Sequence, residues 1–330
     1  MSITLADAKV GMADHVDQQV VDMFRRSSLL LDMLPFDNAI SPGTGGSTLT
    51  YGYIQLKTPS TAATRAINSE YTAGEAKREK KTTSAIIMGG SFKVDRVIQS
   101  TSGAIDELAF QAEQKIKATA NMFHNLVING QSGTGGSGFV NNTFDGLRKL
   151  LNGTSNEMTS ETDISTSALL DNNAQAFLDE LDALAATVDG GATALMMNTK
   201  MLQRVRSAAR RAGYYDRSRD EFGRVVETFN DIPLIDLGGF YDGSTTKDVI
   251  ATSSNTSATG KSSIYAVSMG MDGFHGISPT GTGVISSYMP DMTAPGAVKE
   301  GEVELVAGVA LKNTLKAAVL KDIPIVAQSA

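Results

Sequence analysis

The stretch of sequence that decides the fold is SGAIDELAFQAEQKIKATANMFHNLVING, residues 102–130. Its apolar residues recur at the spacing of one helix face, and most of its charged residues lie off that face. Ser102 is a good N-cap residue, and Gly130 is suited to ending a helix. Asp106 and Glu107, near the start, complement the helix dipole. The sequence therefore predicts one helix over 102–129, roughly 40 Å long at 1.5 Å per residue, which would serve as a spine for other elements.

Two predicted strands with a long polar segment between them precede this helix. Residues 49–56 place aromatic and β-branched residues at alternating positions, and β character resumes over 84–97. Between them, residues 57–83 are polar, rich in Ala and Thr, and heavily charged. A structureless connection of more than about 20 residues is uncommon inside a compact domain, so we expect a long projecting loop. Its charged run, Glu75–Lys81, is either a solvated tip or an electrostatic clasp on another subunit.

An amphipathic segment lies near the start of the chain. From Val10 to Leu34 apolar residues recur at helical spacing, and Pro35 stops the pattern. We interpret this segment as an N-terminal arm helix. A glycine-rich break over 41–47 separates it from the first strand.

The region 167–240 has the pattern of an α/β unit. It predicts a helix over about 169–188, a buried strand over 192–197, and a second helix over 201–212. Asn198 or Thr199 would cap the second helix, and Gly213 would end it. Further strands are predicted at 224–229 and 232–236, joined by a turn at Asn230-Asp231, and at 263–269, 283–288 and 301–312, with an apolar tail over 315–326.

The composition excludes several classes of protein. The chain has 330 residues, with 29 Lys and Arg against 36 Asp and Glu, a formal net charge of −7. This charge disfavours a dedicated DNA-binding protein, which would need a basic field. The absence of cysteine from the sequence excludes disulfides, zinc ribbons and iron–sulfur clusters. No apolar run approaches the ~20 residues that span a bilayer, and the N-terminus does not resemble a signal peptide. We therefore expect a soluble protein made inside the cell.

The chemically suggestive motifs do not form a catalytic centre. The histidines, His15, His124 and His275, fall on the arm, the spine and a late loop, and none is paired at a metal-binding spacing. We expect His124 to be a packing or interface residue. Residues 133–138, GTGGSG, match G-x-G-x-x-G, but a helix precedes them where a nucleotide site needs a strand. The acidic pairs at 106–107, 179–180 and 220–221 fall where we expect surface.

A basic patch covers the second predicted helix of the α/β unit and the residues just after it. Arg206 and Arg210 share a helix face, so we expect contacts with nearby acidic residues or with carboxylates of another subunit, while phosphate binding is the alternative. The arginines of this patch are Arg204, Arg206, Arg210, Arg211, Arg217 and Arg219, and the nearby acids are Asp216, Asp220 and Glu221.

The order of these parts resembles the major capsid proteins of tailed phages, which have the Hong Kong 97 type of fold, and the resemblance covers nearly the whole chain. The sequence segments most similar to that family are MNTKMLQRVR at 197–206, followed by GYY at 213–215, FGRVVETF at 222–229 and DIPLID at 231–236. In the family these segments form a helix that leads into a short hairpin and then a strand containing Ile-Pro.

The resemblance implies an α+β fold of the Hong Kong 97 kind, with an N-terminal arm, an extended E-loop hairpin, a P-domain with a spine helix, and an A-domain. By position, these parts correspond to the N-terminal arm at 1–48, the E-loop at 49–97, the P-domain at 98–166 with the spine at 102–129, the A-domain at 167–288, and return strands with the C-terminal part of the P-domain at 289–330.

Two features of the family are absent from this sequence or incomplete in it. Some relatives carry a cleavable scaffolding segment ahead of the arm, whereas here the arm starts within ten residues of Met1. We therefore expect either a separate scaffolding protein or a mature chain. Some relatives also form a covalent cross-link between an E-loop Lys and an Asn of a neighbour. Lys57, Lys77, Lys80 and Lys81 lie in the matching loop, but no Asn or Glu partner is identified, so the cross-link is not carried over.

The function implied by the resemblance is structural. The chain would assemble with itself as hexamers and pentamers into an icosahedral phage head, in the virion, around double-stranded DNA that it does not read by sequence. Portal and scaffolding proteins, and possible decoration proteins, would be further partners, with assembly in the host cytoplasm and no membrane. We predict no enzyme activity, no cofactor, and no catalytic or metal-binding residue. The expected contacts between subunits are Arg25, Arg26, Glu75, Lys77, Arg78, Glu79, Lys80, Lys81, Arg206, Arg210, Asp216 and Arg217.

Three alternatives remain open from the sequence. An encapsulin-like compartment has the same fold but encloses cargo enzymes. An α/β enzyme would need an acid, a base and a nucleophile in one place, which the sequence does not supply. A tail or baseplate component would form rings or tubes instead of closed shells.

Overall fold

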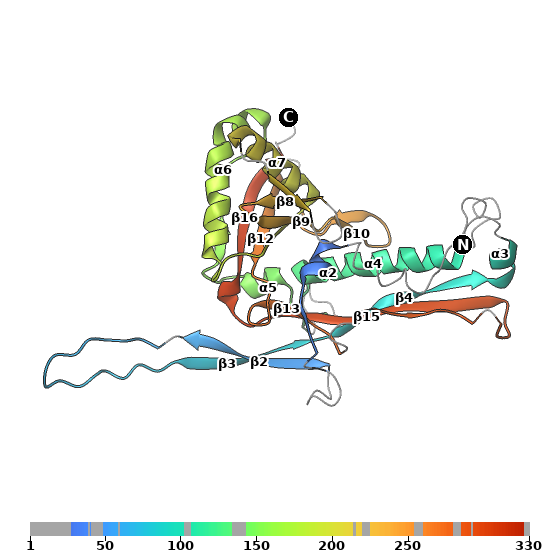
Figure 1. The fold of residues 1–330 in the computed structure, drawn as a ribbon, viewed down its shortest axis with the longest axis horizontal. Coiled ribbons are helices and arrows are strands. Elements are labelled where there is room, and N and C mark those ends of the chain that lie inside the picture. The colour runs from blue at the N-terminus through green and yellow to red at the C-terminus, as the bar shows by residue number, and fades with distance from the viewer. Residues whose placement is uncertain are drawn as a thin grey trace.

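The spine helix runs between a long sheet and a second body of the molecule, and a hairpin projects from one end (Figure 1). The computed structural model describes residues 28–38, 40, 49–58, 60–101, 107–133, 143–213, 216–219, 225–253, 260–279, 285–291 and 293–326. None of the helices in this described part is long and apolar enough to cross a membrane.

The predicted spine is confirmed as helix α4, Glu107–Asn129. Its buried stripe includes Ala112, Ile116, Ala120 and Phe123, each at most 1% exposed. The helix ends before Gly130, as predicted, and its predicted start at 102–106 lies outside the described residues. One expectation was wrong: Glu107 is buried, not at the surface, and accepts a hydrogen bond from Gln111 at 2.6 Å.

The sheet beneath the spine carries the first large core. In this five-stranded sheet the order is β1-β13-β15-β14, and β4 also pairs with β15. Alternate residues of β4 and β15 face α4 and are buried, including Met88, Phe92, Val303 and Leu305. The strands are β1 (Phe36–Asp37), β4 (Ile86–Asp95), β13 (Phe274–Ile277), β14 (Ile285–Tyr288) and β15 (Val298–Leu311).

The second body is the α/β unit, built on a seven-stranded sheet with the order β5-β16-β12-β6-β9-β8-β7. Helices α6 (Ser167–Thr187) and α7 (Thr199–Ala212) pack together and against this sheet around a second core. The strands are β5 (Glu157–Thr159), β6 (Ala194–Met197), β7 (Asp216–Arg219), β8 (Val225–Phe229), β9 (Ile232–Asp236), β12 (Gly260–Val267) and β16 (Ala317–Val326).

The predicted helix caps and turn of the α/β unit are present. Of the two candidate caps, Asn198 is the N-cap of α7, because its side chain accepts a hydrogen bond from the Met201 backbone N–H at 2.8 Å. Gly213 follows the helix in the left-handed conformation at φ 80°. Asn230 and Asp231 both have positive φ, as the tight turn between β8 and β9 requires.

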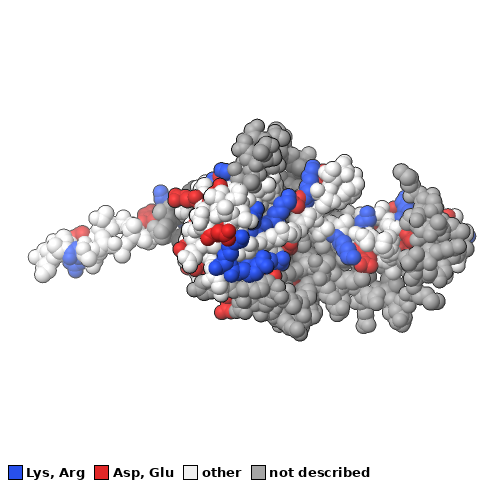
Figure 2. All heavy atoms as spheres, turned by 90° about the horizontal axis from the view of Figure 1, so that it is seen from above, with Lys and Arg blue, Asp and Glu red and all other residues white. Residues whose placement is uncertain are grey.

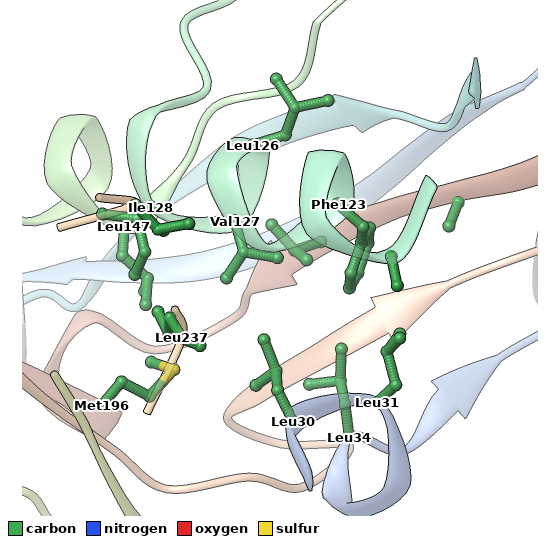
Figure 3. Packing of buried hydrophobic residues seen from close by; sticks show 14 of the residues in the cluster. Leu30, Leu31, Leu34, Phe123, Leu126, Val127, Ile128, Leu147, Met196 and Leu237 are labelled. Carbon is green, nitrogen blue, oxygen red and sulfur yellow. The ribbon is translucent and has the colours of Figure 1, made fainter. Parts of the chain in front are cut away.

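The two bodies share the first core. Figure 3 shows Leu30 of α2 (Leu29–Met33) and Leu34, the residue after this helix, pointing toward the spine, while Met196 and Leu237 reach it from the α/β unit. The remaining elements are α3 (Arg96–Thr101), α5 (Leu147–Leu151), the small hairpin β10 (Gly239–Tyr241) and β11 (Thr246–Asp248), and a short 3-10 helix, Thr314–Lys316.

Three element predictions need correction. The arm helix, predicted over 10–34, is seen only as α2, since residues 1–27 lie outside the described residues; Ser28 caps α2. The strand predicted over 84–97 ends at Asp95, whose side chain accepts a hydrogen bond from the Val97 N–H at 2.7 Å and starts α3. His275 lies in buried strand β13, not in a loop.

The expected boundary between 167–288 and 289–330 does not follow the division of strands between the sheets. Strand β16 lies in the seven-stranded sheet, paired with β12 over most of its length. Its first four residues are all buried, as expected for a strand covered on both faces. Conversely, β13 and β14 belong to the sheet beneath the spine.

Candidate assembly surfaces

The first candidate surface is the hairpin of β2 (Thr50–Thr58) and β3 (Lys77–Ser84), which extends away from both bodies (Figure 1). The two strands pair in antiparallel register from Thr50↔Ser84 to Leu56↔Arg78. The charged run that we predicted inside a loop is therefore mostly strand β3. Residues 60–78, the connection and the start of β3, are all exposed.

The base of the hairpin is fixed to the sheet beneath the spine. Tyr51 and Tyr53 are each 9% exposed and belong to a small core with Ile277 and Ala310. The Tyr51 ring meets the His275 ring edge-on, with 5.8 Å between centroids. The Thr83 hydroxyl donates a hydrogen bond to the Val309 carbonyl at 2.9 Å. These contacts set the direction in which the hairpin leaves the molecule.

The two faces of the hairpin differ in charge. On one face Lys81 pairs with Glu79 at 3.4 Å, opposite Tyr53 and Gln55. On the other face Lys80 lies opposite Ile54, which is 68% exposed, and Arg78 is the next residue of β3 on that side. Within 49–85 the sequence has six Lys and Arg against three Glu, a net charge of +3 in a chain of −7.

The connection at the end of the hairpin exposes apolar surface as well. Ile67 is 91% exposed and Tyr71 64% exposed. The Arg65 guanidinium lies 5.3 Å from the centroid of the Tyr71 ring, a cation–π distance. Exposed side chains of this size, gathered on one projection, are typical of a surface that a partner covers.

A second candidate surface is the junction between the N-terminal segment and the spine. Ser28 Oγ accepts a hydrogen bond from the Leu31 N–H at 3.1 Å and lies 2.5 Å from His124 Nε2. His124 is 5% exposed, and burial lowers its pKa to about 4, although the Leu237 carbonyl opposes the shift in part. A neutral ring accepts a hydrogen bond from the Ser28 hydroxyl at Nε2. This confirms that His124 is a packing residue.

The third candidate surface is helix α7, whose charged residues are all basic: Lys200, Arg204, Arg206, Arg210 and Arg211. Figure 2 shows Lys and Arg gathered over the α/β unit. Arg206 pairs with Glu227 of β8, and Arg211 with Asp171 of α6. Arg210 is exposed, and among the described residues it donates only to the Arg206 carbonyl, at 3.4 Å.

A family model described as SU10 major capsid protein matches residues 9–232. The chain belongs to the SU10 major capsid protein family. No curated protein matches the sequence. The protein is therefore a structural subunit of a phage capsid, built from copies of itself, and its place is the virion.

Solved structures with the same fold include an encapsulin complex, the capsid of a GTA particle and a phage capsid. The holo-SrpI encapsulin complex from Synechococcus elongatus PCC 7942 has a TM-score of 0.59 at 15% identity, covering 100% of this chain and 99% of that chain. The capsid of a native GTA particle has a TM-score of 0.56 at 13% identity, with 90% of each chain covered. The capsid of Myoviridae phage XM1 has a TM-score of 0.51 at 14% identity, covering 98% of this chain and 97% of that chain. At such identities these likenesses show the fold alone, and they confirm the predicted Hong Kong 97-like α+β fold of this capsid protein.

The structure brings one group of predicted contact residues together and separates it from the other. Lys77–Lys81 lie along β3, with Glu75 just before it, whereas Arg206 and Arg210 lie on α7 in the α/β unit. The backbone of Asp216 and Arg217 lies in β7, beside β8, but their side chains are not described. Arg25 and Arg26, like Asp220 and Glu221, lie outside the described residues. The acidic partner of Arg206 is Glu227, which was not among the predicted partners.

An acidic row on β15 was not predicted from the sequence. Glu300, Glu302 and Glu304 alternate with residues that face the spine, so their side chains lie on the opposite face of the sheet. The signal was present in the sequence as EGEVEL at 300–305, where glutamates recur at the period of a strand.

Proposed function

We propose that this major capsid protein assembles as hexamers and pentamers into a closed head around double-stranded DNA. The observation that carries the proposal is the β2–β3 hairpin. It leaves Ile54, Ile67 and Tyr71 more than half exposed, and it points away from the rest of its own chain (Figure 1). Since one subunit cannot bury these side chains, a neighbouring subunit must supply the burial.

In the head, the hairpin corresponds to the E-loop and lies over the spine region of an adjacent subunit. The residues ahead of Ser28, including Arg25 and Arg26, form an arm that clamps another neighbour. The base of this arm is α2, and the Leu30 and Leu31 side chains of α2 are buried in the core of the spine. The five-stranded sheet and α4 serve as the P-domain.

The α/β unit serves as the A-domain and forms the contacts around the five-fold and six-fold axes. Arg210 supports this role because it is exposed and has no acidic partner among the described residues. Arg206 pairs with Glu227 of β8, and the backbone of Asp216 and Arg217 runs beside β8 in β7, so all three take part in these contacts.

The remaining partners follow from the role as a head subunit. A scaffolding protein and a portal would direct assembly in the host cytoplasm, and decoration proteins would bind the finished shell. The net charge of −7 suits a wall to which packaged DNA does not adhere. The wall holds its DNA without reading the sequence, and its role requires no cofactor.

The test is to express the chain alone and with its genomic neighbours, followed by size-exclusion chromatography and negative-stain electron microscopy. Closed icosahedral particles, or capsomer rings without scaffold, are the expected result. A monodisperse monomer under every condition would contradict the proposal and favour the enzyme alternative, whereas tubes would favour a tail component.

An encapsulin-like compartment is the second candidate, because the encapsulin complex has the same fold over the full length of both chains. Particle contents separate the two. Nuclease-protected DNA in particles from infected or induced cells supports a phage head, whereas a co-purifying enzyme bound inside the shell supports a compartment.

A further inference from the structure

We propose that the basic face of the β2–β3 hairpin docks on the acidic face of the β4–β15–β14 sheet of a neighbouring copy of this chain. The basic face consists of Arg78, Lys80 and Ile54. The acidic face consists of Glu302 and Glu304 with Ile87 and Tyr288, on the side of the sheet turned away from α4. The inference rests on the proposed function and narrows it, since it places the hairpin on the sheet that packs against the neighbour's spine, on the side of that sheet turned away from the helix.

The basic face carries two cations without a partner in their own subunit. Arg78 and Lys80 are both exposed and point to the same side of β3, because side chains alternate along a strand. Within the part of the chain that the structure describes, no carboxylate pairs with either of them. By contrast, Lys81 on the other face already has Glu79 as its partner. The apolar component of the basic face is Ile54, directly opposite Lys80.

The acidic face likewise carries two carboxylates that have no ion-pair partner among the described residues of their own subunit. Glu302 is exposed and Glu304 half-buried, and neither forms an ion pair with a described residue. Glu300, next in the row, is already paired with Lys93 at 3.3 Å. Ile87 is 64% exposed and Tyr288 57% exposed, so apolar surface flanks the carboxylates.

Small residues flank Glu304 on both sides and Glu302 on one side, while Tyr288 of β14 lies opposite Glu302. Across the ladder, Glu304 lies between Gly89 of β4 and Ser286 of β14, and Glu302 has Ser91 as its β4 neighbour. Gly89 has a φ of 155°, and a Cβ there would come within 2.0 Å of the Val303 carbonyl oxygen. The position therefore requires glycine, which keeps this side of Glu304 open.

The two surfaces match in spacing as well as in sign. Arg78 and Lys80 are alternate residues of one strand, and so are Glu302 and Glu304, which places each pair about 6.8 Å apart. Two cations can therefore face two carboxylates when the strands run side by side, and Ile54 can meet Ile87 or Tyr288. Complementary charge of this kind fixes the register of a contact and disfavours wrong ones.

The partner must be another subunit. The hairpin leaves one end of the molecule, while β4 and β15 extend toward the opposite end (Figure 1). Each subunit thus presents two different and complementary surfaces. A contact between unlike surfaces of identical chains is heterologous, and repeating it around an axis gives closed rings.

Charge reversal tests the proposal. The basic variant R78E/K80E and the acidic variant E302K/E304K should each lower the yield of particles at least about tenfold, because like charges then face each other. The combined variant R78E/K80E/E302K/E304K should restore most of the yield. Net charge cannot explain this pattern, since the first variant moves from −7 to −11, the second to −3, and the combination returns to −7. Circular dichroism melts of the unassembled proteins should show the wild-type fold for all three.

The outcomes distinguish this inference from the proposed function. If the wild-type chain forms particles and the particle yield of the combined variant stays as low as that of R78E/K80E and of E302K/E304K, the docking proposal is wrong while the capsid role stands. If E302K/E304K assembles normally but exchanging the charges of the Glu113–Lys117 pair, E113K/K117E, blocks assembly, the hairpin lies on the exposed side of the spine instead. If the wild-type chain never forms particles, the proposed function itself fails.

Discussion

The burial of His124 predicts that the subunit loses stability in acid through one identified residue. In the folded state burial lowers the pKa of His124 to about 4, while an exposed histidine titrates near 6.5. Between these two pH values the unfolded chain binds a proton that the folded chain does not. The contribution of His124 to the free energy of unfolding should therefore be constant above pH 6.5 and fall as the pH drops from 6.5 to about 4.

The expected magnitude follows from the same two values. Each pH unit between them contributes about 1.36 kcal/mol, so the loss attributable to His124 is about 3 kcal/mol. Protonation would place a charge in the core beside Phe123 and Val127, and it would remove the Nε2 lone pair that faces Ser28 Oγ. The base of the N-terminal arm, α2, is therefore the part that we expect to detach first.

The assay is urea unfolding of the unassembled subunit at several pH values, for the wild type and for His124→Gln. Glutamine does not titrate, and it retains a polar group near Ser28, so groups other than His124 contribute equally to both proteins. Buried His275, whose pKa burial also lowers, is one such group. The difference in unfolding free energy between the two proteins should shift by about 3 kcal/mol in favour of His124→Gln between pH 7 and pH 4. Parallel stability curves would refute the reasoning.

Three further predictions concern the hairpin, the spine and the cap of α7. Replacing residues 60–76 by Asn-Gly should leave the thermal melting temperature of the subunit nearly unchanged, because all of these residues are exposed. The same change should abolish the particles seen in electron micrographs. Normal particles would mean that the hairpin is not an assembly element. Ile116→Asp should prevent folding, since a carboxylate at a site 1% exposed costs several kcal/mol, while the size-matched control Ile116→Leu should lose less than about 1.5 kcal/mol in urea unfolding. Asn198→Ala should lower the free energy of unfolding by about 2–3 kcal/mol in the same assay. The reason is that Asn198, which is 1% exposed, accepts a hydrogen bond from the Met201 N–H and donates one to the Ile250 carbonyl at 2.8 Å. A loss below about 0.5 kcal/mol would show that water replaces both hydrogen bonds.

Helices and tight turns could be read from the sequence because local residues determine them. The spine follows from an apolar stripe repeated over 107–129, and α7 follows from a cap, a stripe and a glycine within one short segment. The turn at Asn230-Asp231 needs positive φ at both positions, and these residue types tolerate it. None of these features depends on a distant part of the chain.

Strand β3 could not be read in the same way. Lys77–Ser84 has no apolar residue and therefore no alternation between a buried and an exposed face. Its extended form comes from pairing with β2, whose register is fixed at Tyr51 and Tyr53 by the small core around Ile277. The place of β16 beside β12 is likewise set by pairing across about fifty residues of intervening chain, which local periodicity does not encode.

The features that local patterns could not predict are also the ones that concern assembly. A strand composed mainly of Lys, Arg, Glu and Thr gains little from burial within its own subunit, so its sequence is free to serve a contact with another. The same holds for the outer side of β15, where the inward residues Val303 and Leu305 are fully buried and the alternate positions carry carboxylates. One strand thus satisfies two requirements at once, since its inner residues hold the spine and its outer residues remain available to a neighbour. Mutations on the outer side should therefore change assembly with little effect on folding, whereas mutations on the inner side should abolish both.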